Sequence, residues 1–151
     1  MIKRIDIKNP VILDQIITLQ RASYLIEAEM IDFYEIPPLI ETKAELLQCR
    51  ESFYGYFTED RLVGLLSYTV DKQILDICRI AVHPDYFRKG IADALLSQAL
   101  TLPDIKKALV ATGQKNLPAV RLYQKHGFIQ TGSKEIGEGI YIVEFEFSLN
   151  R

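Results

Sequence analysis

The sequence contains few cysteines and no long hydrophobic run, and each absence excludes a class of protein. Its 151 residues include two cysteines, Cys49 and Cys78, which are too few for a disulfide framework and lack metal-ligand spacing. The longest apolar stretches, such as residues 62–66, are far below the roughly 18 residues that a membrane span needs. Charged residues within the first 14 positions interrupt the apolar core of any signal peptide. We therefore expect a cytoplasmic protein with reduced thiols and no membrane partner.

The net charge is also small. Eighteen Lys and Arg against 20 Asp and Glu give −2, which does not predict a nucleic-acid partner. Residues 1–60 carry 6 basic and 11 acidic side chains (net −5), whereas residues 61–151 carry 12 and 9 (net +3). This asymmetry is compatible with two ligands of opposite charge or with ordinary variation of a protein surface.

Composition and length predict one folded domain. Hydrophobic residues make up 48% and charged residues 25%, close to the average of soluble globular proteins. There is no repeat, low-complexity run or Gly/Ser linker, and domains usually have about 100–200 residues. We expect residues 1–151 to form a single domain.

Hydrophobic periodicity predicts alternating strands and helices. Residues 2–8 alternate as in a strand, and residues 11–31 have helical spacing. Pro37-Pro38 is expected to break the chain before a short helix of about 42–49. Three apolar runs separated by polar turns predict an antiparallel meander; these runs are residues 53–58, 62–70 and 74–82.

The second half of the chain continues the pattern. We expect helices over about 91–102 and 117–126, and strands over 107–112, 128–131 and 143–149. The resulting order, β-α-α-β-β-β-α-β-α-β-β, predicts an α/β (α+β) fold with a mixed, mostly antiparallel sheet flanked by helices.

One loop has the features of an anion site. Residues 76–82 read as a strand, and the loop that follows leads through Gly90 into a helix. Free amides and the helix dipole favour negative charge at such a helix start. Gly90 and the small Ala92 permit close approach of a phosphate, and Arg88 and Lys89 add positive charge.

The same loop resembles the first acyl-CoA motif of the GNAT N-acetyltransferases, Gln/Arg-x-x-Gly-x-Gly/Ala. Gly90 and Ala92 match its small positions, whereas Phe87 stands where Gln or Arg is usual. The resemblance implies that backbone amides in this segment hold the CoA pyrophosphate. The residues concerned are Arg88, Lys89, Gly90, Ile91, Ala92 and Asp93.

A downstream segment resembles the second motif of that family. The matching residues are Asn116, Ala119, Tyr123, Gly127 and Phe128. Two matches in the right order, together with the predicted element order, identify the chain as a member of the GNAT family. Membership implies an N-acetyltransferase that uses acetyl-CoA as cosubstrate, needs no metal, and transfers the acetyl group to a primary amine in a ternary complex.

Tyr123 and Asn116 each have a structural and a functional interpretation. The helix pattern alone makes Tyr123 a core residue, whereas the resemblance implies that its hydroxyl protonates the departing CoA thiolate. Asn116 suits the N-cap of its helix. The resemblance adds a contact with the pantetheine or pyrophosphate arm.

The resemblance also implies a role for the strand before the loop. Ile80, Ala81 and Val82 would splay from the strand of residues 107–112 and bind pantetheine through free backbone groups. The N–H of Val82 or Ile80 would then polarise the thioester carbonyl.

Attack on a thioester requires a proton acceptor for the amine. Asp76, on the strand that leads to Val82, is the first candidate by position. Further candidates on the first helix are Tyr24, Glu27 and Glu29. Three side chains are interpreted as structural: His83, His126 and Cys78, the last as a small buried residue.

The acceptor remains open, but charge favours a cationic amine. Residues 22–42 contain no Lys or Arg. Their acidic residues are Glu27, Glu29, Asp32, Glu35 and Glu41. By resemblance this segment forms one wall of the acceptor site. The alternatives are a CoA-binding sensor or assembly module without activity and an enzyme for longer acyl groups or protein amines; a homodimer is also open.

Overall fold

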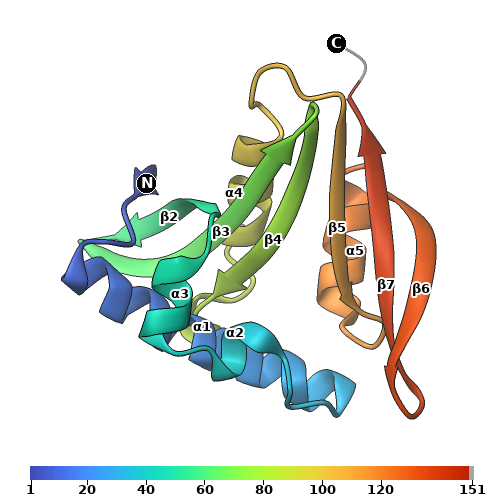
Figure 1. Ribbon diagram of the computed structural model, residues 1–151, viewed down its shortest axis with the longest axis horizontal. Coiled ribbons are helices and arrows are strands. Elements are labelled where there is room, and N and C mark those ends of the chain that lie inside the picture. Colours follow the sequence, from blue (N-terminus) through green and yellow to red (C-terminus); the bar gives the residue numbers. More distant parts are fainter. Residues whose placement is uncertain (150–151) are drawn as a thin grey trace.

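The structure, a computed structural model that describes residues 1–149, contains one seven-stranded sheet (Figure 1). Its strand order is β1-β2-β3-β4-β5-β7-β6, and only the β4–β5 pair is parallel. The strands are β1 (Ile2–Ile5), β2 (Ser52–Thr58), β3 (Arg61–Asp71), β4 (Ile74–Val82), β5 (Lys107–Gly113), β6 (Ile129–Gly137) and β7 (Ile140–Ser148). The predicted mixed, mostly antiparallel sheet is confirmed.

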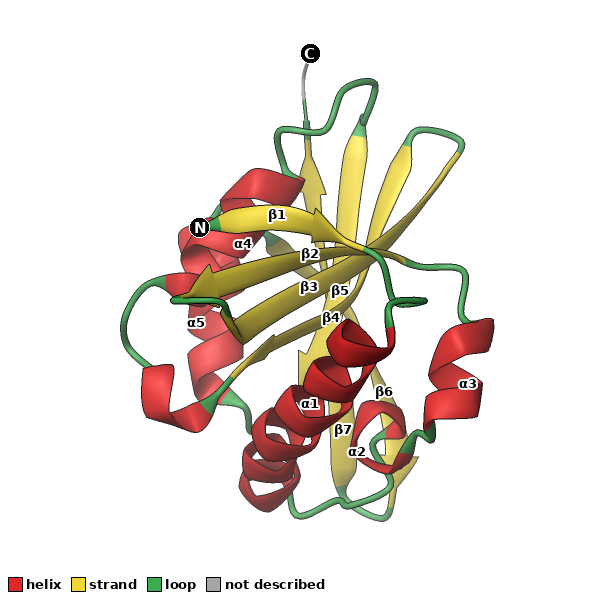
Figure 2. Ribbon diagram, turned by 90° about the vertical axis from the view of Figure 1, so that its left-hand side faces the viewer, coloured by secondary structure: helices red, strands yellow, loops and turns green. Residues whose placement is uncertain are grey.

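Helices cover both faces of the sheet (Figure 2). They are α1 (Pro10–Ile31), α2 (Pro37–Ile40), α3 (Lys43–Gln48), α4 (Ile91–Ala99) and α5 (Leu117–Lys125), with a 3₁₀ turn at Pro84–Tyr86. One core cluster joins α1 and α3 to the sheet, and a second joins α4 and α5 to its other face. The two clusters explain why most strands are apolar on both sides.

Most elements lie where the sequence predicts them, with three differences. β1 ends at Ile5 rather than at residue 8, because a turn follows and Asn9 caps α1 through its Oδ1, which accepts from Val11 N–H at 2.9 Å. Pro37-Pro38 was expected only to interrupt regular structure, but these two residues form the start of α2. Proline is tolerated in the first turn of a helix. β6 extends to Gly137, well beyond the predicted residue 131.

β4 and β5 are paired over only three positions. Ile74 pairs with Lys107, Leu75 with Ala108, and Asp76 with Leu109. Beyond these pairs the two strands diverge (Figure 1). The later part of β4 therefore has one edge that no strand within residues 1–149 covers.

A β-bulge reverses the facing of β4 in its middle. Ser67 of β3 pairs with Arg79 and Tyr68 pairs with Ile77, so that Cys78 is the extra residue. Ile77 belongs to the α4 cluster, whereas Arg79 lies over Phe53 of the α1 cluster. Because of the bulge, Ile80 packs against the α4 cluster instead of the α1 cluster.

Within residues 1–149, none of the helices is both long and apolar enough to cross a membrane.

Candidate active site

Two cavities meet where β4 and β5 diverge. The first, called here the β5 cavity, has a volume of about 360 Å³ and lies between α1, α2 and strands β4, β5 and β7. The second, the α4 cavity, has a volume of about 520 Å³ and lies between α1, the start of α4 and α5. Six residues line both cavities and are called the junction: Tyr24, Glu27, Ile80, Asn116, Ala119 and Tyr123. A molecule in one cavity can therefore meet a molecule in the other only at these side chains.

The start of α4 is open toward the α4 cavity. Gly90 precedes the helix with φ of 76°, and no side chain caps the first turn. A Cβ at Gly90 would meet nothing within 4 Å, but the left-handed φ disfavours any other residue. The exposed amides of this first turn can donate hydrogen bonds to an anion, and the predicted anion site at this position stays a prediction.

Cationic side chains line the same cavity. Arg88 lies in the loop before α4, and Arg121 and Lys125 lie one turn apart on α5. Lys89 does not line the cavity, and its ammonium lies 5.3 Å from the centre of the Tyr86 ring. The α4 cavity thus combines helix amides with positive charge, which suits a phosphorylated ligand.

Asp93 links α4 to the end of α5. Its Oδ1 accepts a hydrogen bond from Lys125 at 3.0 Å and lies 3.0 Å from His126 Nε2. The hydrogen bond from Lys125, with help from His126, holds the pKa of Asp93 below its ordinary value. This contact of His126 is compatible with the structural role that the sequence predicts.

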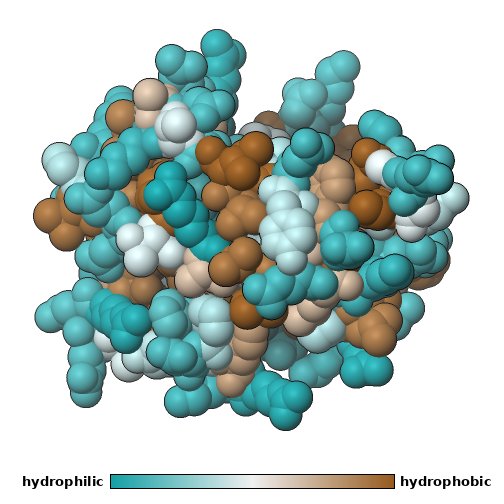
Figure 3. Space-filling model, turned by 90° about the horizontal axis from the view of Figure 1, so that it is seen from below, coloured by the Kyte–Doolittle hydropathy of each residue, from teal (hydrophilic) through white to brown (hydrophobic). Residues whose placement is uncertain are grey.

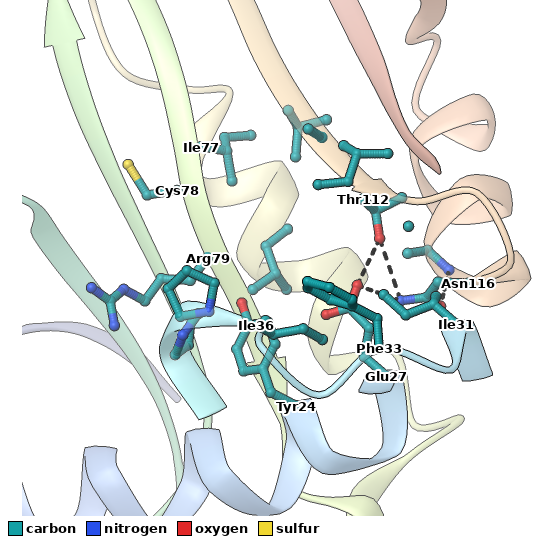
Figure 4. Close-up of a pocket in the computed structure, with 18 of the residues that line it drawn as sticks. Tyr24, Glu27, Ile31, Phe33, Ile36, Ile77, Cys78, Arg79, Thr112 and Asn116 are labelled. Atoms are coloured by element: carbon teal, nitrogen blue, oxygen red, sulfur yellow. Dashed lines mark hydrogen bonds between the residues drawn. The ribbon is translucent and has the colours of Figure 1, made fainter. Parts of the chain in front are cut away.

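The junction is organised around the carboxylate of Glu27. Its Oε1 accepts from Thr112 Oγ1 at 2.9 Å and from Asn116 Nδ2 at 3.1 Å (Figure 4). Asn116 is also the N-cap of α5, since its Oδ1 accepts from Ala119 N–H at 3.3 Å. Among the described residues, no group donates a hydrogen bond to Glu27 Oε2. This oxygen is the junction's available proton acceptor.

Two buried phenols stand beside this carboxylate. Tyr123 is 5% exposed, and its ring packs against Phe128 and Phe145 with centroids 5.8 and 5.7 Å away. Burial, with the nearby charge of Glu27, raises the pKa of Tyr123. The same two causes raise the pKa of Tyr24. Both side chains stay protonated at neutral pH and are therefore proton donors rather than bases.

The uncovered edge of β4 faces the junction. Val82 N–H donates to Ser23 Oγ at 3.2 Å, so it points away from β3 and toward α1. Ile80, two residues earlier, presents its N–H on the same edge, because strand amides alternate. Ala81 is 1% exposed and belongs to the α1 cluster, so its side chain lies outside both cavities.

Asp76 is not brought together with the other predicted residues. It is exposed and lines neither of the two cavities. Partial desolvation of the carboxyl by its surroundings, with the neighbouring charge of Glu51, nevertheless raises the pKa of Asp76. The bulge explains its position, because residues 76 and 80 would share a face in a regular strand but do not here. Cys78 is exposed rather than buried for the same reason.

Sequence reasoning missed an ion-pair cluster beside the β5 cavity. Arg79 is 6% exposed, and its guanidinium binds Glu41 at 2.7 Å and Glu51 at 2.8 Å. Gln20 and Ser67 complete the cluster through bonds of 3.0 Å to Arg79 and 2.5 Å to Glu51. An arginine inside an otherwise apolar strand was the available signal, because a buried cation needs partners.

The predicted acidic wall is only partly present. Glu27 and Glu41 line the β5 cavity, whereas Glu29, Asp32 and Glu35 are exposed and line neither cavity. Within residues 1–149 no group of three or more His, Cys, Asp or Glu side chains could hold a metal ion.

Comparison with known proteins identifies similar chains. The family model described as acetyltransferase (GNAT) family matches residues 13–128. A Bacillus subtilis (strain 168) protein named UPF0157 protein YqkA is 36% identical over 146 residues, which are 96% of this chain and 43% of that protein. The chain thus spans less than half the length of this curated relative.

Solved structures share the fold. PH1933 from Pyrococcus horikoshii OT3 superposes with a TM-score of 0.82 at 21% identity, covering 100% of this chain and 99% of that one. The PaiA N-acetyltransferase from Thermoplasma acidophilum, solved in complex with coenzyme A, gives a TM-score of 0.75 at 19% identity over 97% and 98% of the two chains.

Proposed function

The chain belongs to the acetyltransferase (GNAT) family, and on that premise we propose that it transfers an acetyl group from acetyl-CoA to a primary amine. The observation that carries the proposal is the junction, where two cavities share a carboxylate and two buried phenols. One cavity takes the donor and the other the acceptor, so the reacting atoms meet between them. We further propose that residues 1–151 act as a single domain in the cytoplasm.

The α4 cavity is assigned to acetyl-CoA. The amides of residues 88–93 bind the pyrophosphate, as favoured by the open start of α4 and the positive charge around it. The free edge of β4 at Ile80 and Val82 binds the pantetheine arm in the manner of an added strand. The coenzyme A complex of the Thermoplasma acidophilum acetyltransferase, which has the same fold, supports this assignment.

The reaction is a direct acyl transfer. The amine nitrogen attacks the thioester carbonyl, and a C–N bond forms while the carbonyl oxygen becomes an oxyanion. The N–H of Ile80 or of Val82 stabilises this charge, by exchanging its present acceptor, Tyr24 or Ser23 respectively, for the oxyanion. Before the attack, Glu27 Oε2 takes one proton from the ammonium, because only the neutral amine is a nucleophile. The C–S bond then breaks, Tyr123 gives its proton to the thiolate, and the resulting tyrosinate takes the second proton from the nitrogen. The products are an N-acetyl amide and CoA.

The β5 cavity favours a cationic acceptor. Three carboxylates, Glu27, Glu41 and Glu51, and one guanidinium, Arg79, line it, which gives −3 + 1 = −2. A net negative cavity concentrates ammonium ions and repels carboxylates.

The test is release of CoA thiol from acetyl-, propionyl- and succinyl-CoA over a panel of small amines and basic peptides. We expect turnover with acetyl-CoA and at least one amine. Binding of CoA without turnover of any amine would instead favour a CoA-binding module without activity. The position of Tyr123 and Glu27 at the junction argues against that alternative.

A further inference from the structure

Beyond the junction, most of the side chains that line the β5 cavity are apolar. Its apolar side chains come from the end of α1, the segment before α2, and strands β5, β6 and β7. They include Ile31, Phe33, Ile36, Val110, Ile136 and Ile142. In Figure 3, which views the molecule from below, hydrophobic side chains gather in the middle of the face among hydrophilic ones. A ligand that fills this cavity removes this apolar surface from water.

Arg79 cannot recognise a carboxylate on the ligand. Its five N–H groups all have acceptors, because Nε donates to Glu51, Nη1 to Gln20 and Glu41, and Nη2 to Glu41 and Glu51. It is the only cationic side chain among the described residues that line this cavity. Figure 4 shows the Arg79 side chain pointing away from Glu27. A ligand carboxylate here would lose its hydration without gaining a partner.

The anionic groups likewise leave room for one ammonium rather than several. Glu41 and Glu51 both bind Arg79, and only Glu27 has a carboxylate oxygen without a donor among the described residues. The remaining acids of this wall, Glu29, Asp32 and Glu35, line neither cavity. Further charges on a polyamine would therefore lie against the apolar lining.

We propose that the acceptor is a primary amine with a compact apolar body, one positive charge and no carboxylate. This inference rests on the proposed function for the role of the ligand as acetyl acceptor. What it adds is the chemical class of the ligand that fills the β5 cavity. The ammonium lies at Glu27, and the apolar body lies against the side chains of α1, β5 and the β6–β7 hairpin.

Four probe amines test this assignment. 2-Phenylethylamine has the apolar body, ethylamine lacks it, phenylalanine adds a carboxylate, and spermidine replaces the body by further charges. We expect kcat/KM with acetyl-CoA to be at least tenfold higher for 2-phenylethylamine than for each of the other three. Equal or higher values for spermidine or phenylalanine would overturn the proposal.

A matched pair of variants on β6 localises the effect. Ile136 lines the cavity, whereas Ile129 is 71% exposed on the same strand and does not. Ile136→Ser should raise KM for 2-phenylethylamine at least fivefold and leave KM for ethylamine and acetyl-CoA unchanged. Ile129→Ser should change none of the three. Equal effects of both variants, or no effect of Ile136→Ser, would contradict the assignment.

A binding measurement separates this proposal from the proposed function. Calorimetry without acetyl-CoA should give tighter binding for 2-phenylethylamine than for spermidine or phenylalanine, and Ile136→Ser should weaken it. If this binding preference is observed but no amine is acetylated, the proposed transferase activity is refuted and the proposed ligand chemistry stands. Turnover confined to polar amines would support the transferase and refute the proposed ligand chemistry. Equal binding of the probes, or no binding of any of them, would also refute the ligand chemistry.

Discussion

The side-chain amide of Asn116 donates to Glu27 Oε1 at 3.1 Å across 89 positions of the chain. The same residue caps α5 through its Oδ1. One asparagine therefore fixes both the start of α5 and the orientation of a carboxylate on α1. Because α1 and α5 belong to different core clusters, this hydrogen bond fixes the position of one wall of the junction relative to the other.

Replacing Glu27 tests its role as proton acceptor. Glu27→Gln keeps an oxygen for the donors Thr112 and Asn116 but cannot take a proton. We expect kcat to fall by about 10²–10⁴-fold, with little change in KM for acetyl-CoA. The deficit should shrink as pH rises, because more of the amine is then already neutral. Steady-state kinetics between about pH 6 and pH 10 measure this.

The control for this variant is Glu29→Gln, on the same helix but outside both cavities. Its kinetics should equal those of the parent protein. A pH-independent deficit in Glu27→Gln would assign Glu27 to positioning rather than to proton transfer.

The two buried tyrosines can be distinguished by paired substitutions. Tyr123→Phe keeps the ring packing against Phe128 and Phe145 and removes only the hydroxyl. Since Tyr123 is the proposed acid, we expect the kcat of Tyr123→Phe to fall by up to about 10²–10⁴-fold and Tyr24→Phe to have a smaller effect on kcat. Because burial raises the pKa of Tyr123, the phenol stays protonated and should produce no loss of activity as pH rises toward 10. The reverse ranking of the two variants would identify Tyr24 as the donor.

A pair of glycines tests the pyrophosphate site. Gly90 and Gly139 both have positive φ, 76° and 72°, and both have open space around an added Cβ. Gly90→Glu and Gly139→Glu should therefore carry similar backbone strain. Only the first places a carboxylate at the start of α4, so only it should weaken CoA binding, by more than about tenfold in calorimetry. Unchanged affinity in a folded Gly90→Glu protein would locate the phosphates elsewhere.

The Arg79 cluster should contribute to stability in a pH-dependent way. Burial opposes ionisation of Glu51, but hydrogen bonds from Arg79 and Ser67 outweigh it and lower its pKa. A carboxyl with a lowered folded-state pKa stabilises the protein above its unfolded pKa, and this contribution is lost as pH falls through the folded value. Arg79→Met leaves two half-buried carboxylates, Glu41 and Glu51, without their cation.

We therefore expect Arg79→Met to lose about 3–5 kcal/mol of unfolding free energy at about pH 7. The loss should be smaller at about pH 3, because the contribution of Glu51 declines as pH falls toward its lowered folded-state pKa. Urea unfolding at both pH values measures the difference. Arg50→Met, at an exposed arginine, should have little effect. An equal loss at both pH values would attribute the effect to packing of the arginine side chain instead.

The sequence predicts the fold well where apolar residues form a continuous run or recur on one face of a helix. The meander of β2, β3 and β4 follows from three apolar runs separated by polar turns, and the helices α1 and α5 follow from helical spacing. The length of β6 is underestimated from the sequence, because the strand is polar and largely exposed on both sides. Its pairing with β7 determines how far it extends. α2 was missed because two prolines indicate a break unless the chain after them is helical.

The site was predicted less completely, and the bulge at Cys78 is the main reason. Alternation places Asp76 beside Ile80, but one inserted residue reverses the facing, and no pattern in the sequence marks it. Glu27 could be recognised only as one of several acids on α1. Its partners Thr112 and Asn116 lie more than 80 positions away, at separations of 85 and 89 residues, and only tertiary packing brings them together.

The three residue pairs between β4 and β5 divide the sheet into two parts, strands β1–β4 and strands β5–β7. Residues from both parts of the chain meet at the junction: Ile80 lies on β4, and Asn116 follows β5 and donates to Glu27 of α1. Ligands in the two cavities would contact the same junction residues. Any change that one ligand causes in the affinity of the other must therefore be matched by an equal change in the opposite direction of coupling, whichever ligand binds first.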